Sequence, residues 1–238
     1  MHAGRAVSWD GFHNARDLGE LPTRDGGVTR RGAFYRSATV ELVTAEGWHA
    51  AHEAGVRTVV DLRNDEEVDG LPTDPVVMTR VRVPLDGVED TELWRHLSEE
   101  GLHGTPMYYA PFLSRRPDRV VAVMTALART APGGVLFHCG AGRDRTGLVT
   151  LLLLALADVE PEAVADDYML TVEPLRALLA HLGRPDDQPI IDRQLAARGT
   201  TARDSLLATL EELDVATYLR DAGMSEDDLQ TLRSRLVE

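Results

Sequence analysis

The 238-residue chain contains no lysine, so all 25 of its basic residues are arginine. The 39 acidic residues outnumber them and give a formal net charge of -14. An acidic protein is repelled by nucleic-acid backbones and by anionic lipid headgroups, so we expect neither a nucleic-acid partner nor stable membrane association. An anionic ligand must therefore be attracted locally, by a few arginines and backbone amides.

Cysteine and long apolar runs are equally scarce. Cys139 is the single cysteine, which excludes an intrachain disulfide and fits a reducing compartment. The longest apolar run, 148–157, is shorter than the ~20 residues that span a bilayer. Residues 1–10 lack the apolar core of a secretory signal. These absences predict a soluble, cytoplasmic protein, and 43% apolar residues are enough for a folded core.

Helical and extended patterns alternate along the first two thirds of the chain. The sequence predicts strands over 56–62, 80–85 and 135–138, helices over 44–54, 118–130 and 146–158, and a hairpin turn within 21–28. From Pro161 onward the pattern is helical, with Gly223 ending one helix and Ser225 opening the last. We therefore expect a single α/β domain over residues 1–238, with a largely parallel central sheet flanked by helices and a helical C-terminal third.

A glycine-rich segment follows the strand at 135–138. Its two glycines let the backbone curl so that several amides point at one anion, and the next helix adds its positive N-terminus. Arg145 lies six positions after Cys139 and is expected to return over the same anion as a bidentate fork. The segment predicts a phosphate-binding loop formed by Gly140, Ala141, Gly142, Arg143, Asp144, Arg145 and Thr146.

Cys139 is the candidate nucleophile of this loop. A helix N-terminus and a nearby arginine stabilise a thiolate, which can attack phosphorus. We expect the Thr146 hydroxyl to hydrogen-bond that sulfur or to cap the helix, and Gly147 to allow close packing below the loop. His138 is expected to fix the Cys139 backbone or tune its charge rather than act as a base. An ordinary buried cysteine is the alternative, but it leaves the fixed spacing of the following arginine, threonine and glycine unexplained.

The string from His138 to Gly147 resembles the active-site loop of the protein tyrosine phosphatase superfamily. With Arg143-Asp144 inside it, the string is most similar to atypical bacterial tyrosine/serine phosphatases of the mycobacterial secreted type, in which lysine is usual at the position of Arg143. Further motifs resemble the same family: Asn14 to Gly19, Tyr35-Arg36-Ser37, Asp61-Leu62-Arg63 with Glu67, and the helical region 218–233.

The resemblance implies metal-independent, cofactor-free hydrolysis of phosphomonoesters through a cysteinyl-phosphate intermediate. Phosphotyrosine on protein is the leading substrate, with phosphoserine or phosphothreonine as a second specificity and a phosphoinositide or other small phosphoester as the alternative. Sulfur transfer also uses a cysteine in an anion-binding loop, but the Arg-Thr-Gly ending speaks against it. A non-catalytic phosphate reader is disfavoured by the intact pair Cys139 and Arg145.

Two aspartates compete as the proton donor to the leaving group. Asp144 is favoured because the resemblance implies an acid inside the loop, although it could instead orient Arg145 or the hydrolytic water. Asp86 follows a strand, where a movable acid loop would fall. Asp61 is expected to pair with a nearby arginine, and Arg63 and Arg36 either to hold the loop in shape or to bind substrate.

The remaining polar clusters do not predict a catalytic or metal site. His49 and His52 lie on one helical face without a third ligand, so we expect no metal site. The acidic pairs 166–167 and 186–187 are expected to face solvent. The helix at 174–183 and the polar loop at 184–188 correspond to a region that contributes to a helical lid in relatives, which predicts a mobile cover.

Overall fold

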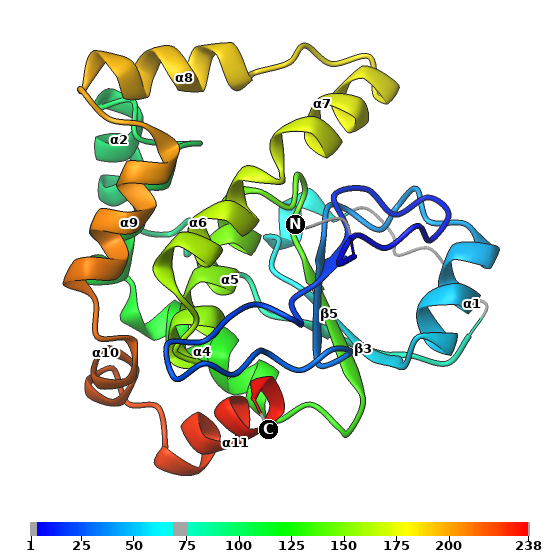
Figure 1. Ribbon diagram of the computed structural model, residues 1–238. Coiled ribbons are helices and arrows are strands. Elements are labelled where there is room, and N and C mark those ends of the chain that lie inside the picture. The colour runs from blue at the N-terminus through cyan, green and yellow to red at the C-terminus, as the bar shows by residue number, and fades with distance from the viewer. Residues whose placement is uncertain (1–3, 69–75, 238) are drawn as a thin grey trace.

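The computed structural model describes residues 4–68 and 76–237, and its sheet runs through the middle of the molecule (Figure 1). Within those ranges the strand order is β1-β2-β5-β3-β4. β2 (Phe34–Ser37), β5 (Gly134–His138), β3 (Val56–Asp61) and β4 (Thr79–Arg82) run parallel, and the short β1 (Arg16–Asp17) is antiparallel to β2. The prediction of a largely parallel sheet is confirmed, and β5 delivers the glycine-rich loop from its centre.

The helices follow the order expected of an α/β protein. Their bounds are α1 Ala45–Glu53, α2 Thr91–Glu99, α3 Tyr109–Arg115, α4 Pro117–Ala128, α5 Asp144–Leu156, α6 Pro161–Met169, α7 Val172–His181, α8 Gln188–Ala197, α9 Ala202–Glu212, α10 Val215–Asp221 and α11 Glu226–Leu236, with short 3₁₀ turns at Asp65–Glu67 and Pro106–Tyr108. In the described part of the chain, none of these helices combines the length and apolar character needed to cross a membrane.

The strands separate two apolar layers because successive side chains point to opposite faces. Phe34, Val60 and Phe137 join the larger core with the C-terminal helices. Their neighbours Tyr35 and Leu136 face the smaller core beneath α1. Figure 1 shows α1 alone on its side of the sheet, and α4, α5 and α11 on the other.

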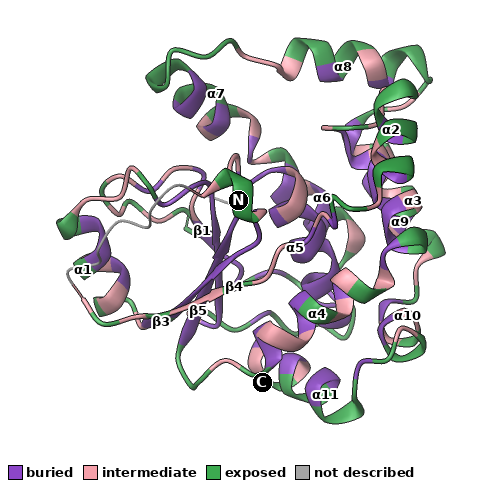
Figure 2. Ribbon diagram, turned by 180° about the vertical axis from the view of Figure 1, so that it is seen from behind, coloured by how far each residue is buried: buried purple, intermediate pink, exposed green. Residues whose placement is uncertain are grey.

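α5 carries the end of the glycine-rich loop into the larger core. Its residues from Thr146 to Leu154 are all buried, and Figure 2 shows this helix and the central strands β2, β5 and β3 as largely buried, whereas β4 is not. Gly147 is required by packing: a Cβ there would lie 2.5 Å from the Tyr109 hydroxyl oxygen. The loop is therefore seated directly on tightly packed helix and sheet, which limits its movement.

Two predicted elements differ in extent from those observed. The turn within 21–28 forms an isolated antiparallel bridge between Pro22 and Val28 rather than a full hairpin. β4 ends at Arg82, before Pro84, which has no amide hydrogen for the sheet. The chain still follows the edge of β3, since the Leu85 amide donates to the Leu62 carbonyl at 3.2 Å.

The N-terminus of α1 offers a test of local stability. Thr44 is the N-cap, and its side chain accepts a hydrogen bond from the Gly47 amide at 3.1 Å. We expect Thr44→Ala to lower the free energy of unfolding by about 1 kcal/mol, measured by urea denaturation. Thr44→Ser keeps the hydroxyl and is the matched control; equal losses in both variants would contradict the capping role.

Candidate active site

Cys139 directly follows β5 and is 2% exposed. The Thr146 hydroxyl, in the first turn of α5, donates a hydrogen bond to its sulfur at 3.2 Å. The predicted contact between Thr146 and Cys139 is therefore confirmed. The sulfur lies against the positive end of a helix, where a negative charge is stabilised.

The carbonyls at the start of the loop are bound from outside it. The Cys139 carbonyl lies 3.1 Å from the ring Nδ1 of His138, and the Gly140 carbonyl accepts from the Thr39 amide at 2.9 Å. When the carbonyls of a curled loop are bound outside the curl, its amide groups point toward the interior of the curl. An anion can bind there.

The next two carbonyls are held by buried side chains. The amide nitrogen of Asn14 donates to the Ala141 and Gly142 carbonyls at 3.2 and 3.1 Å. Arg36 donates to the Gly142 carbonyl at 2.7 Å. Gly142 has φ +68, and a Cβ there would lie 2.5 Å from the Ser37 carbonyl oxygen, so only glycine fits this part of the loop.

His138 is fully buried beneath the loop. Burial lowers the pKa of its ring to about 4, although the Asp61 carboxylate 3.9 Å away opposes this. The ring is therefore neutral near neutral pH, and its Nδ1–H is the donor that suits the Cys139 carbonyl. This arrangement fits the expected supporting position rather than that of a base.

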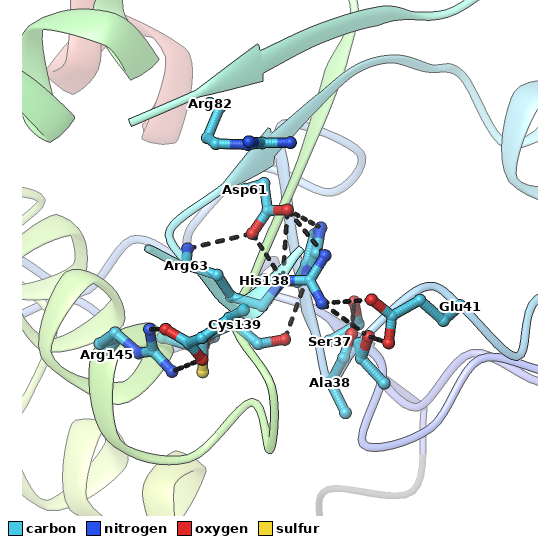
Figure 3. Close-up of polar contacts among 12 residues, drawn as sticks. Ser37, Ala38, Glu41, Asp61, Arg63, Arg82, His138, Cys139 and Arg145 are labelled. Atoms are coloured by element: carbon cyan, nitrogen blue, oxygen red, sulfur yellow. Dashed lines mark hydrogen bonds and ion pairs between the residues drawn. The ribbon is translucent and has the colours of Figure 1, made fainter. Parts of the chain in front are cut away.

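Asp61 and Arg63 form a bidentate pair at the end of β3 (Figure 3). The third arm of the Arg63 guanidinium reaches Glu41 at 2.5 Å. Although burial opposes it, Arg63 holds the pKa of Asp61 below its usual range. Arg63 thus binds the 39–41 segment to the end of β3, and Asp61 holds Arg63 in place, as a structural role for Asp61 predicts.

Arg145 lies beside Cys139 (Figure 3), and its guanidinium is paired with two carboxylates. Its two terminal nitrogens contact Glu67 at 2.5 and 2.8 Å, and one of them lies 3.1 Å from Asp86. Burial lowers the pKa of Arg145, but Glu67, the Cys139 sulfur and Asp86 together raise it above its ordinary value. The guanidinium is therefore permanently charged next to the sulfur.

Asp86 belongs to the loop after β4 and has a largely buried side chain, 16% exposed. The amide of Asn64 donates to its carboxylate at 2.9 Å. Burial raises the pKa of Asp86 even though Arg145 and Asn64 oppose the shift. A carboxyl group that keeps its proton to higher pH is suited to donate it.

Asp144 and Arg143 form a second set of ion pairs at the end of the loop. Asp144 is the first residue of α5 and lies 3.3 Å from the Arg143 Nε. The two terminal nitrogens of Arg143 bind Asp187 at 2.9 and 3.0 Å. Asp187 is 46% exposed, as expected of a solvent-facing residue, but the expectation did not include its pairing with Arg143 or that of Asp186 with Arg176.

The expectation for the acidic pair on α6 is corrected by the structure. Asp166 is 39% exposed and pairs with Arg203. Asp167 is completely buried and binds Arg5, Arg16 and Arg36. The expectation of a solvated face is wrong for Asp167 because it lies on the inward face of α6, towards arginines from the N-terminal segment and β2.

Several residues around the site were not assigned a role from the sequence. Glu67 and Asn14 lie inside motifs that resemble the family, and this was the available signal. Asp167 and Asp187 carry no local signal, because their arginine partners come from distant segments. Charge pairs across a fold cannot be read from helical periodicity.

The chain matches the sequence model of the tyrosine phosphatase family over residues 7–238, and it belongs to that family. A Cupriavidus necator protein named as a tyrosine-protein phosphatase is 32% identical over 170 residues, which cover 68% of this chain and 62%, less than two thirds, of that protein. A tyrosine-protein phosphatase of Nostoc commune is 28% identical over 225 residues (86% of this chain, 74% of the relative).

A third relative and one solved structure are also similar to this chain. The triple specificity protein phosphatase PtpB of Mycobacterium tuberculosis is 26% identical over 275 aligned residues, covering 95% of this chain and 97% of that protein. Among solved structures, P. aeruginosa TpbA in complex with pTyr is 19% identical, with a TM-score of 0.38 and coverage of 81% of this chain and 87% of that one.

The Arg143–Asp187 pair joins the loop to the segment between α7 and α8. We expect Asp187→Asn to speed amide hydrogen exchange in 182–190, because it removes the charge that holds this segment to Arg143. Exchange is followed by mass spectrometry. Asp192→Asn is the control, since this exposed α8 residue contacts the Gln188 side chain instead; equal exchange in the two variants would contradict the prediction.

Proposed function

We propose that this chain is a metal-independent, cysteine-dependent phosphatase whose leading substrate is phosphotyrosine on protein. The observation that supports it best is the position of Cys139: its sulfur accepts a hydrogen bond from Thr146 at the start of α5 and lies beside Arg145. A curled loop, a helix N-terminus and a guanidinium together form a site for a tetrahedral dianion. The names of the relatives support the choice of phosphotyrosine.

In the proposed reaction the Cys139 thiolate attacks phosphorus and displaces the alcohol or phenol oxygen. Loop amides from Gly140 to Thr146 and the Arg145 guanidinium stabilise the charge on the equatorial oxygens. A carboxylic acid protonates the leaving oxygen, and water then cleaves the phosphorus–sulfur bond and restores the thiolate. Arg145 is already oriented by Glu67, so little reorganisation is needed when the dianion binds.

We propose Asp86 as the proton donor. Its raised pKa and its place beside Arg145 support this role more than the position of Asp144 does. Asp144 is the first residue of α5 and pairs with the Arg143 Nε at 3.3 Å. In this proposal Asp144 keeps Arg143 in place. The Asp86→Asn and Asp144→Asn variants test whether Asp144 is the proton donor instead.

We further propose that α7, α8 and the segment between them form a mobile cover over the site. Leu175 and Leu178 of α7 pack with Ala38 and with the loop residue Ala141. Figure 1 shows α7 and α8 beyond the end of the sheet that carries the loop. Vanadate is expected to slow hydrogen exchange of this cover, and an unchanged rate would count against it.

The reaction is tested with p-nitrophenyl phosphate in the presence of EDTA. We expect the chelator to leave the rate unchanged, because the loop amides and Arg145 supply the charge stabilisation. Cys139→Ser should abolish turnover while the melting temperature stays near that of the wild type. Loss of activity in EDTA that added metal restores would overturn the proposed mechanism.

The same preparation defines the substrate class. A phosphotyrosine peptide is compared with its phosphoserine counterpart and with a phosphoinositide. Faster hydrolysis of the phosphotyrosine peptide supports the proposal, and faster hydrolysis of the lipid headgroup assigns the alternative.

The proton donor is identified with two matched variants, Asp86→Asn and Asp144→Asn. We expect Asp86→Asn to slow hydrolysis of phenyl phosphate by ~10²–10⁴, the usual contribution of a general acid, and to affect an activated fluorinated ester much less. The wild-type rate should fall as pH rises through the raised pKa of Asp86, and this fall should be absent in Asp86→Asn. The opposite pattern would assign the proton donation to Asp144.

The stability of Asp86→Asn provides a separate check. A carboxyl whose pKa is higher in the folded than in the unfolded state adds stability at low pH and loses it as pH rises through the folded value. At pH 7 we therefore expect Asp86→Asn to be at least as stable as the wild type.

A further inference from the structure

A buried charge cluster lies under the phosphate loop. Asp167 of α6 binds Arg5 at 2.9 Å, Arg16 at 3.0 Å and Arg36 at 2.8 Å. The side chains of Asp167 and Arg36 have no exposed surface, and those of Arg5 and Arg16 are 4% exposed. Three guanidinium groups thus meet one carboxylate away from water.

This cluster carries an excess of positive charge. The arginines hold the pKa of Asp167 far below its usual range although burial opposes it. Burial and the charge of Arg36 lower the pKa of Arg16 to about 10, so it still keeps its proton at neutral pH. Burying a charge without a full set of opposite charges lowers the stability of the fold. Hydrophobic residues of similar size would fill the same space with a smaller loss of stability. The arrangement therefore calls for a role beyond packing.

Two arms lead from Asp167 to the loop. In the first, Arg36 binds Asp167 with one terminal nitrogen and donates with the other to the Gly142 carbonyl at 2.7 Å. In the second, Arg16 binds Asp167 and donates to the Asn14 side-chain oxygen at 2.7 Å.

The second arm also determines which way the Asn14 amide points. Because Arg16 holds the oxygen, the NH₂ group faces the loop, where it donates to the Ala141 and Gly142 carbonyls. Both arms therefore meet at the Gly142 carbonyl, the second arm also holds the Ala141 carbonyl, and both begin at the same carboxylate.

We propose that Asp167 is a positioning residue for phosphate binding and catalysis. Acting through Arg36 and through Arg16 and Asn14, it holds the Ala141 and Gly142 carbonyls on the outer side of the loop and so turns the loop amides toward the substrate phosphate. This inference rests on the proposed function of the loop, and it adds a residue of α6, outside the loop motif, to the machinery that supports it.

The sign of a charge change separates this role from a general electrostatic effect. Removing the negative charge of Asp167 makes the region more positive, and Coulomb attraction alone would then tighten binding of an anion. Loss of positioning predicts the reverse, since the released arginines repel one another and the loop carbonyls lose their donors.

The test compares Asp167→Asn with Asp166→Asn, the adjacent residue that pairs with Arg203 at the surface. Inorganic phosphate binding is measured by calorimetry, and kcat and KM with p-nitrophenyl phosphate. We expect Asp167→Asn to weaken phosphate binding about tenfold or more and to lower kcat, and Asp166→Asn to match the wild type. Unchanged or tighter binding in folded Asp167→Asn overturns the proposal.

A second variant keeps the test decisive if Asp167→Asn does not fold. Asn14 has φ 51, so Asn14→Gly retains the backbone conformation while removing both hydrogen bonds to the loop. We expect weaker phosphate binding with little change in melting temperature, and unchanged binding overturns the role of this arm.

When both variants fold, the double variant should lose less than the two single losses multiplied together, because both act on the same peptide groups. Independent, multiplicative losses would contradict action through Asn14. A wild-type protein that neither binds phosphate nor hydrolyses the ester would instead refute the proposed function itself.

Discussion

The outward attachment of the loop carbonyls is the constraint on which the rest of the site depends. A curled backbone presents its amides to an anion only if its carbonyls are bound elsewhere. Here the donors come from separate parts of the chain: the Thr39 amide, the Asn14 side chain and Arg36 of β2. The glycines permit the curl, but these surrounding donors select it from the many conformations that glycine allows. The position of Cys139, the proposed nucleophile, thus depends on how the sheet, the N-terminal segment and α6 hold the loop.

Acidic residues pair with the arginines of the site. Arg145 is held by Glu67 and Asp86, and Arg143 by Asp187. These carboxylates orient the guanidinium groups in advance, but they also compete with an incoming phosphate for the same donors. The global charge of -14 adds no attraction for such a ligand. Selectivity therefore rests on the geometry of a few donors, which favours a tetrahedral dianion over a single carboxylate.

Much of the fold and the centre of the site could be predicted because their signals are local. The β-branched strand before Asp61, the N-cap Thr44 and the spacing of Cys139, Arg145 and Thr146 each act within a few residues of chain. The surroundings could not be predicted in the same way. The sequence around Asp167 predicts a solvent-exposed helix face. Its burial depends on arginines that lie more than a hundred residues away in the sequence. Similarly, the raised pKa of Asp86 arises from tertiary burial.

The lack of lysine has a consequence for how the protein responds to its solution. A buried ammonium group readily gives up its proton, whereas a guanidinium keeps it through the whole physiological range. Even Arg16, with its pKa lowered to about 10, stays charged there. The charge of the arginine cluster under the loop therefore does not change with pH in the physiological range. Since this cluster cannot titrate, any sensitivity of turnover to acidity in this range must originate in the few groups that handle the transferred proton and the sulfur.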